Sequence, residues 1–132
     1  MYDNVIFSAY KNETDGTYIS AGNYLEKFNG YLTNFGNGFL LPNGTFTAPR
    51  IGTYEFSIAA HSYSSNVAQL TVEHNGADVL SFFTRGSSYN TLSFSWIMEL
   101  QQEDTVKFKV TSGNIYCHTS YDCIFSGKLI KN

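Results

Sequence analysis

Three loop segments hold the residues of this chain that could bind a ligand. In segments 61–66, 85–90 and 116–122, tyrosine, histidine, arginine, asparagine and aspartate stand beside serine and glycine. Tyrosine rings stack on the apolar faces of sugars, and amide, guanidinium or carboxylate groups bond sugar hydroxyls or carboxylates. The candidate ligand-binding residues are Tyr63, Arg85, Tyr89, Asn90, His118, Tyr121 and Asp122. The alternative is that these segments are ordinary solvated loops.

Catalysis is not indicated by the residue types that usually perform it. The histidines are His61, His74 and His118, and none stands in a recognisable nucleophile motif. No glycine-rich phosphate loop follows a strand into a helix, and no close pair of carboxylates is spaced for acid and base roles. His74 precedes an Asn-Gly turn, which favours an exposed loop position. We therefore expect no enzyme activity and no cofactor.

The two cysteines, Cys117 and Cys123, leave several interpretations open. Two half-cystines so close in sequence could close a small loop in an oxidising compartment. They could instead be unpaired thiols on facing strands. A metal site with His118 lacks an evident fourth ligand nearby, so no metal is expected. The disulfide is the favoured interpretation.

Composition sets the class of protein and excludes several partners. The chain has 132 residues, 14% of them charged and 17% aromatic, which is typical of one folded domain rather than a disordered segment. The net charge is -3 and the eight lysines and arginines are scattered, so nucleic acid is not an expected partner. No apolar stretch is long enough for membrane insertion, and the N-terminus lacks a signal-peptide pattern. Sequons at Asn12 and Asn43 are weak support for secretion.

The elements that must position the loops are predicted to be strands. Residues 53–60 and 91–100 alternate between apolar and polar types, and Tyr54, Phe56 and Ile58 should share one buried face. Asn75-Gly76 is a strong hairpin signal between two further strands. Helical periodicity is absent, so the chain is predicted to be all-β, a sandwich or jelly roll, with residues 1–132 as a single domain.

Segment 28–58 supplies aromatic anchors between glycine, asparagine and proline residues, which suits a loop-rich segment leading into a sandwich. The chain has 11 Phe, 10 Tyr and 1 Trp, more rings than a small core needs, so some are expected between subunits. The candidates for such an interface are Phe7, Phe82, Phe83, Phe94 and Phe125.

One family shares this pattern along nearly the whole chain. The spacing of seven residues resembles the signature of the C1q globular domain: Phe28, Asn34, Phe39, Phe46, Gly52, Tyr54 and Phe56. The segments 7–9, 70–72, 75–76 and 125–129 are similar to other strands and turns of that family. Two positions depart from its pattern. Ile58 replaces an aromatic residue, and Glu103 replaces the usual glycine before Asp104.

The resemblance implies a C1q/TNF-like jelly roll of about ten strands in two sheets that assembles as a homotrimer. Some members bind calcium through acidic residues in a loop that corresponds to segment 84–90. That loop has no carboxylate here, so no such site is expected. Asp15, Asp104 and Asp122 are isolated and are better explained as residues that cap turns.

The sequence therefore predicts a secreted, extracellular homotrimer that recognises a glycan or a microbial surface, with a lectin-like role in innate immunity. The alternative is a structural head that trimerises an extracellular-matrix or collagen-like assembly. Fold alone does not decide between these functions.

Overall fold

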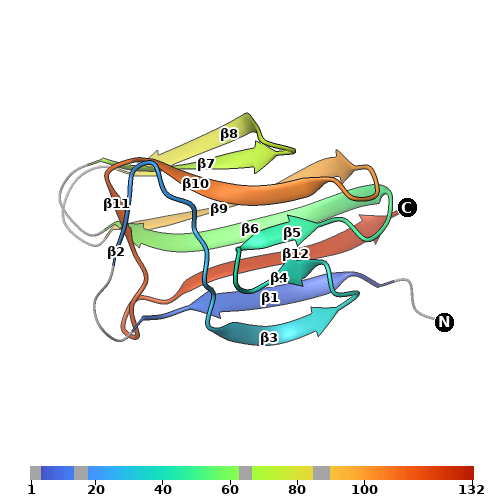
Figure 1. Ribbon diagram of the computed structural model, residues 1–132, viewed down its shortest axis with the longest axis horizontal. Helices are drawn as coiled ribbons and strands as arrows, with labels where there is room; N and C mark the ends of the chain where they lie inside the picture. The colour runs from blue at the N-terminus through green and yellow to red at the C-terminus, as the bar shows by residue number, and fades with distance from the viewer. Residues whose placement is uncertain (1–3, 14–17, 63–66, 85–89) are drawn as a thin grey trace.

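The computed structural model describes residues 4–13, 18–62, 67–84 and 90–132, which form two antiparallel β-sheets packed face to face (Figure 1). The strands are β1 (Ile6–Lys11), β2 (Tyr18–Ser20), β3 (Gly30–Phe35), β4 (Phe39–Leu40), β5 (Thr45–Thr47), β6 (Gly52–Ser62), β7 (Ala68–His74), β8 (Ala77–Thr84), β9 (Thr91–Leu100), β10 (Thr105–Ser112), β11 (Asn114–Tyr116) and β12 (Cys123–Lys131). The described residues include no helix, hence none with the length and hydrophobicity of a membrane span. The prediction of an all-β sandwich is confirmed.

The seven-stranded sheet is built around β6. One edge of β6 pairs with β9 through residues 52–61. The other edge pairs with β12 through residues 53–59 and then with β11 through His61 and Ser62. Strands β1 and β3 continue the sheet beyond β12, and β2 continues it beyond β11. The second sheet has the order β4-β5-β10-β7-β8. The short β2–β11 ribbon therefore extends one end of the sandwich (Figure 1).

The core between the sheets is dominated by phenylalanine. Tyr54, Phe56 and Ile58 are buried, which confirms the face predicted from the alternation. Phe125 is fully buried and lies at the centre of the ring contacts. Its ring meets those of four other buried phenylalanines at centroid distances of 4.7–5.9 Å: Phe7, Phe39, Phe56 and Phe108. Such pairs stabilise a fold beyond the apolar area that they bury.

Two of the proposed interface residues are instead part of this core. Phe7 and Phe125 are buried inside one chain, at 2% and 0% exposure, so they cannot lie between subunits. Alternation in a strand assigns a residue to a face but does not say what covers that face, which explains the error. Phe82 and Phe94 are partly buried and pack against each other, and Phe83 is exposed.

Two elements also differ from their prediction. Residues 30–35 form the edge strand β3, where a loop-rich segment was expected. A register shift opposite Ser8 and Ala9 interrupts its alternation, which hides the strand from a period-two search. Strand β6 continues through His61 and Ser62, which were assigned to a loop, because β11 supplies a second partner there. Twelve strands are described rather than about ten because four of them have only two or three residues.

Hydrogen bonds among the side chains of His74, Asn75 and Asp104 join two turns at the far end of the sandwich, and we term this cluster the polar clasp. The Asn75-Gly76 hairpin is confirmed, and both residues adopt positive φ, as a type I′ turn requires. The Asp104 carboxylate accepts hydrogen bonds from the Asn75 side-chain amide (3.0 Å), from His74 Nε2 (3.0 Å) and from the backbone N–H of Gln101 (2.8 Å). These bonds lower the pKa of Asp104 from 3.8 to about 2. His74 is thus part of a structural cluster rather than an isolated loop residue.

Acid should weaken this clasp. Because the folded-state pKa of Asp104 lies below its unfolded value, the carboxylate stabilises the fold above about pH 4, and this contribution is lost as the pH falls toward about 2. Asp104→Asn should therefore melt below the wild type at about pH 6, and the gap should narrow at about pH 2. Thermal unfolding, followed by circular dichroism, measures the difference in melting temperature between variant and wild type at each pH.

The control is Asp78→Asn, because Asp78 is an exposed carboxylate of β8 with no side-chain hydrogen bond among the described residues. The difference in melting temperature between Asp78→Asn and the wild type should not narrow in this way between about pH 6 and about pH 2. An Asp104 gap of equal size at both pH values would contradict the role assigned to the carboxylate.

Candidate functional site

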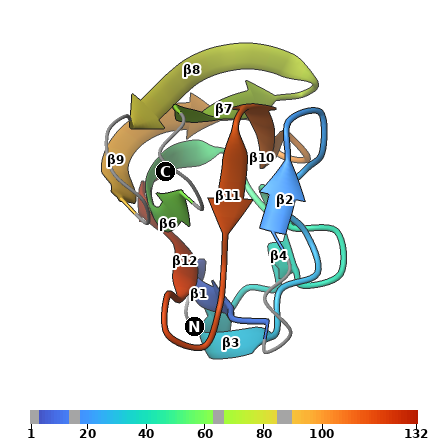
Figure 2. The same cartoon turned by 90° about the vertical axis from the view of Figure 1, so that its left-hand side faces the viewer.

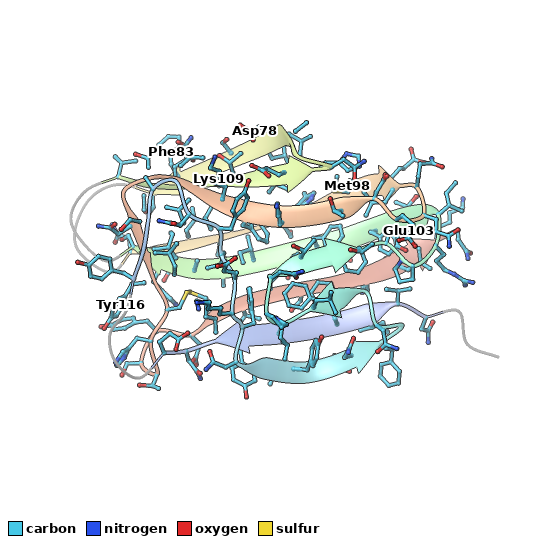
Figure 3. The ribbon with its side chains drawn as sticks, in the orientation of Figure 1. Asp78, Phe83, Met98, Glu103, Lys109 and Tyr116 are labelled. Atoms are coloured by element: carbon cyan, nitrogen blue, oxygen red, sulfur yellow. A yellow bond between two sulfur atoms is a disulfide. The ribbon has the colours of Figure 1, made fainter. Side chains whose placement is uncertain are left out.

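The candidate site lies at the end of the sandwich where β2 and β11 stand side by side (Figure 2). Strand β6 ends there at Ser62, and segment 117–122 connects β11 to β12. Tyr116, the last residue of β11, lies at this end in the view with side chains (Figure 3). The strand order therefore places the described residues of candidate segments 61–66 and 116–122 around one end of β6.

Segment 117–122 is held closed by covalent and hydrogen bonds. Cys117 and Cys123 form a disulfide bridge with an S–S distance of 2.15 Å. His118 and Tyr121 exchange two backbone hydrogen bonds of 3.0 Å and 2.7 Å, which leaves Thr119 and Ser120 as a two-residue tip. The backbone N–H of Ser120 donates to Nδ1 of His118 at 3.2 Å. The loop is therefore ordered before any ligand arrives, which lowers the entropic cost of binding.

Four rings gather on this end and form what we term the aromatic end cluster: His61, Tyr116, His118 and Tyr121. The rings of Tyr116 and His118 are stacked, with centroids 5.4 Å apart and an interplanar angle of 7°. Tyr121 bridges the two sides of the cluster, at 5.9 Å from Tyr116 and 5.6 Å from His61. All four side chains are half-buried, so each ring still presents part of its surface to solvent.

His61 connects the cluster to the rigid sheet. Its Nε2–H donates to the backbone carbonyl of Asp122 at 2.9 Å, since a carbonyl can only accept. The neutral ring then has Nδ1 available to accept from the Thr91 hydroxyl at 3.3 Å. These bonds join β6, the start of β9 and the end of the disulfide loop, so the loop is held in place by two other elements.

The structure brings together the candidate residues that it describes. His118 and Tyr121 belong to the cluster, and Asp122 follows directly with an exposed side chain. Asn90 lies beside the end of β6, where its backbone carbonyl accepts from the backbone N–H of Ser62 at 2.8 Å and its own N–H donates to the Ser62 hydroxyl at 3.0 Å. Tyr63, Arg85 and Tyr89 lie outside the described residues. His61 and Tyr116 were not among the candidates, because only the pairing of β6 with β11 shows that they flank the loop.

The chemistry of this end suits the binding of a ligand. The Asp122 carboxylate has no hydrogen-bond or ion-pair partner among the described residues, so it is available to accept bonds from a ligand. Within the described part of the chain, no group of three or more His, Cys, Asp or Glu residues could hold a metal ion. Aromatic rings beside an accepting carboxylate can bind a ligand that has both an apolar face and hydroxyl donors.

A second surface covers the outer face of the seven-stranded sheet. Directly paired residues form a row of hydroxyl groups across five strands: Ser95, Ser57, Ser126, Ser8 and Thr33. A shallow groove of about 320 Å³ lies over this row. Ile97 and Phe35, both 60% exposed, flank it at the two edges of the sheet. The only ion pair recorded among the described residues of this face joins Lys128 to Glu55 at 3.7 Å.

The edge formed by β8 and β9 exposes several apolar side chains. Strand β8 is the last strand of its sheet and is exposed along most of its length (Figure 3). Its exposed side chains include Val79, Leu80 and Phe83. An edge strand of this kind usually needs a cover, since its unpaired backbone groups and apolar side chains promote association.

Comparison with known proteins decides the family. A family model for the C1q domain matches residues 6–130. The chain belongs to the C1q-domain family. The two departures from its pattern are accommodated in different ways. Ile58 is buried at 1% exposure, as a residue of the core face should be, whereas Glu103 adopts a φ of 74°, a left-handed conformation that favours the glycine of the family pattern.

Solved structures place this C1q domain within the C1q/TNF-like jelly-roll fold. The globular domain of the zebrafish complement 1qA protein is similar, with a TM-score of 0.77 and 24% identity over 97% of this chain and 99% of that one. The Eiger TNF of S. frugiperda has a TM-score of 0.76 and 11% identity, covering 98% of this chain and 94% of its own. Murine APRIL has a TM-score of 0.68 and 13% identity, and the match covers 94% of this chain and 98% of that one. At these identities the structural likeness concerns the fold alone.

Proposed function

We propose that this C1q domain is a secreted, homotrimeric recognition module that binds glycans through the aromatic end cluster and Asp122. Membership of the C1q family indicates a ligand-recognition or trimerising module, and the site adds the chemistry of the ligand. The observation that carries the proposal is a cluster of four half-buried rings around a closed loop, beside an exposed carboxylate. Sugars offer an apolar ring face for stacking and hydroxyl donors for the carboxylate.

The disulfide supports the extracellular part of the proposal. Disulfides persist mainly in oxidising compartments, and this one closes the loop that carries His118 and Tyr121. Asn43 of the second sequon is exposed, which is compatible with glycosylation. A glycan or microbial surface outside the cell is the ligand class that agrees with both features.

Two surfaces with exposed apolar side chains support the trimer. The β8–β9 edge and the outer face of the seven-stranded sheet differ in shape, so a contact between them is heterologous, and repeated heterologous contacts can close a ring. The outer face is poor in charge, as the centre of an interface usually is. A particle in which each β8–β9 edge covers the next subunit's sheet would bury Ile97 and Phe83.

The same surfaces favour a second candidate function. If association is the only role of the domain, it is a structural head that trimerises an extracellular assembly, and the end cluster has no ligand. The two functions make different predictions, because only recognition requires exposed rings at the end of β6.

A glycan array combined with light scattering separates the two. We expect saturable binding by a trimeric wild type, and a loss of about tenfold or more in affinity for Tyr121→Ala, because the central ring of the cluster is removed. Tyr121→Phe keeps the ring and should retain most of the affinity. Asp122→Asn should weaken binding, whereas Asp78→Asn, an exposed carboxylate on β8, should not.

A flat array with intact trimers would contradict recognition and favour the structural head. A particle that stays monomeric at high concentration would contradict the assembly. Tyr89→Ala is a further variant for the same array, as Tyr89 remains a candidate from the sequence.

A further inference from the structure

A groove of about 450 Å³ lies beside the aromatic end cluster and is not part of it. Its lining comes from β1, from β2 and from the segments that follow these two strands, and it includes the polar and aromatic residues Lys11, Glu13, Tyr18, Asn23, Glu26 and Lys27. We call it the β2 groove. The groove and the cluster are neighbours, because Tyr18 on β2 stands directly opposite Tyr116 on β11. Residues directly opposite in an antiparallel pair have side chains on the same face.

Lys11 gives the groove a polar side chain in a fixed position. It is only 5% exposed, and its Nζ donates to Glu13 Oε1 at 2.9 Å and to the backbone carbonyl of Lys27 at 3.1 Å. An ammonium group has three donors, and within the described part of the chain these are its two partners. One N–H is therefore left to bond a ligand in the groove. The backbone N–H of Glu13 donates to the backbone carbonyl of Cys117 at 3.1 Å, which connects the groove to the disulfide loop.

The charge of the lining selects the chemistry of the ligand. Two ammonium groups, Lys11 and Lys27, are balanced by the carboxylates of Glu13 and Glu26. An anion would meet both carboxylates and a cation both ammonium groups, so neither is favoured. A hydroxyl group can donate to the carboxylates and accept from the ammonium groups. The ring of Tyr18, which is 44% exposed, offers an apolar face for stacking.

We propose that the β2 groove is a second sugar subsite, so that the domain recognises a neutral oligosaccharide rather than a single sugar. One sugar stacks on the aromatic end cluster, and a linked sugar enters the groove and stacks on Tyr18. This inference rests on the proposed glycan binding and names the class of glycan. Acidic sugars are disfavoured, because the carboxylates of Glu13 and Glu26 offset the two ammonium groups of the groove and Asp122 adds an exposed carboxylate beside the cluster.

Titration calorimetry on the full trimer tests the subsite. The probes are galactose, glucose and N-acetylglucosamine, their β-linked di- and tetrasaccharides, and sialylated forms of the same chains. We expect the wild type to bind a neutral oligosaccharide about tenfold more tightly than the matching monosaccharide, and the sialylated form more weakly. Tyr18→Ala should lose the advantage of the oligosaccharide and keep the affinity for the monosaccharide. Tyr18→Phe should restore the advantage, because it keeps the ring.

The outcomes separate the two proposals. If the wild type binds none of the probes, both the glycan function and the subsite are wrong. If it binds sugars but Tyr18→Ala weakens mono- and oligosaccharides equally or not at all, the end cluster binds glycan and the subsite is wrong. Equal affinity for neutral and sialylated chains would overturn the assignment of a neutral ligand. Circular dichroism and light scattering on each variant confirm that the fold and the trimer are unchanged.

Discussion

Phe125→Ala should lower the free energy of unfolding by about 3–5 kcal/mol, as truncation of a fully buried phenylalanine typically does. Phe125 is 0% exposed, and four other buried rings meet its own ring. Its neighbours come from both sheets, so the cavity removes contacts from the whole core rather than from one strand. Domains of this size are stable by only about 5–15 kcal/mol, which makes this loss a large share of the total.

Urea denaturation at a fixed protein concentration measures the loss, since assembly makes the apparent stability depend on concentration. Leu40→Ala is the control. Leu40 is 52% exposed on the edge strand β4, and its truncation should change the free energy of unfolding by no more than about 0.5 kcal/mol. Similar losses at the two positions would contradict the assignment of Phe125 to the centre of the core.

Gly113→Ala should cost about 3 kcal/mol or more, and it should also displace the candidate site. Gly113 forms the turn between β10 and β11 with a φ of 66°, which other residues rarely adopt. A Cβ atom there would lie 2.1 Å from the backbone carbonyl oxygen of Val67. Because backbone and not a flexible side chain blocks the space, the turn must move, and β11 moves with it. The cost combines the left-handed conformation, about 1–2 kcal/mol, with this displacement.

Gly76→Ala is the matched control for backbone strain. Gly76 has a φ of 84° in the β7–β8 hairpin, yet nothing lies within 4 Å of the added Cβ. It should therefore lose only about 1–2 kcal/mol and keep any glycan affinity, whereas Gly113→Ala should lose both stability and affinity. Equal stability losses measured by urea denaturation would show that the contact with Val67 is relieved easily and that the turn does not fix the site.

Much of the fold follows from short-range features of the sequence. The alternation of Tyr54, Phe56 and Ile58 predicts a strand with one buried face, and Asn75-Gly76 predicts the hairpin, because each depends on residues that are close in the chain. Strand β3 was missed because its register shift, which depends on a partner strand, removes the alternation. The spacing of the seven signature residues likewise indicates the C1q family, because it depends on their order along the chain and not on strand pairing.

Only the tertiary structure decided which of the side chains that could bind a ligand lie together in space. His61 and Tyr121 are 60 positions apart in the chain, and they meet because β11 and β12 share one edge of β6. The β2 groove is likewise visible only once Tyr18 is paired with Tyr116. The sequence by itself determined which residues of a strand share a face, since side-chain direction alternates along each strand. Which element covers each face, and which loops meet at one end, depends on long-range pairing that no local pattern encodes.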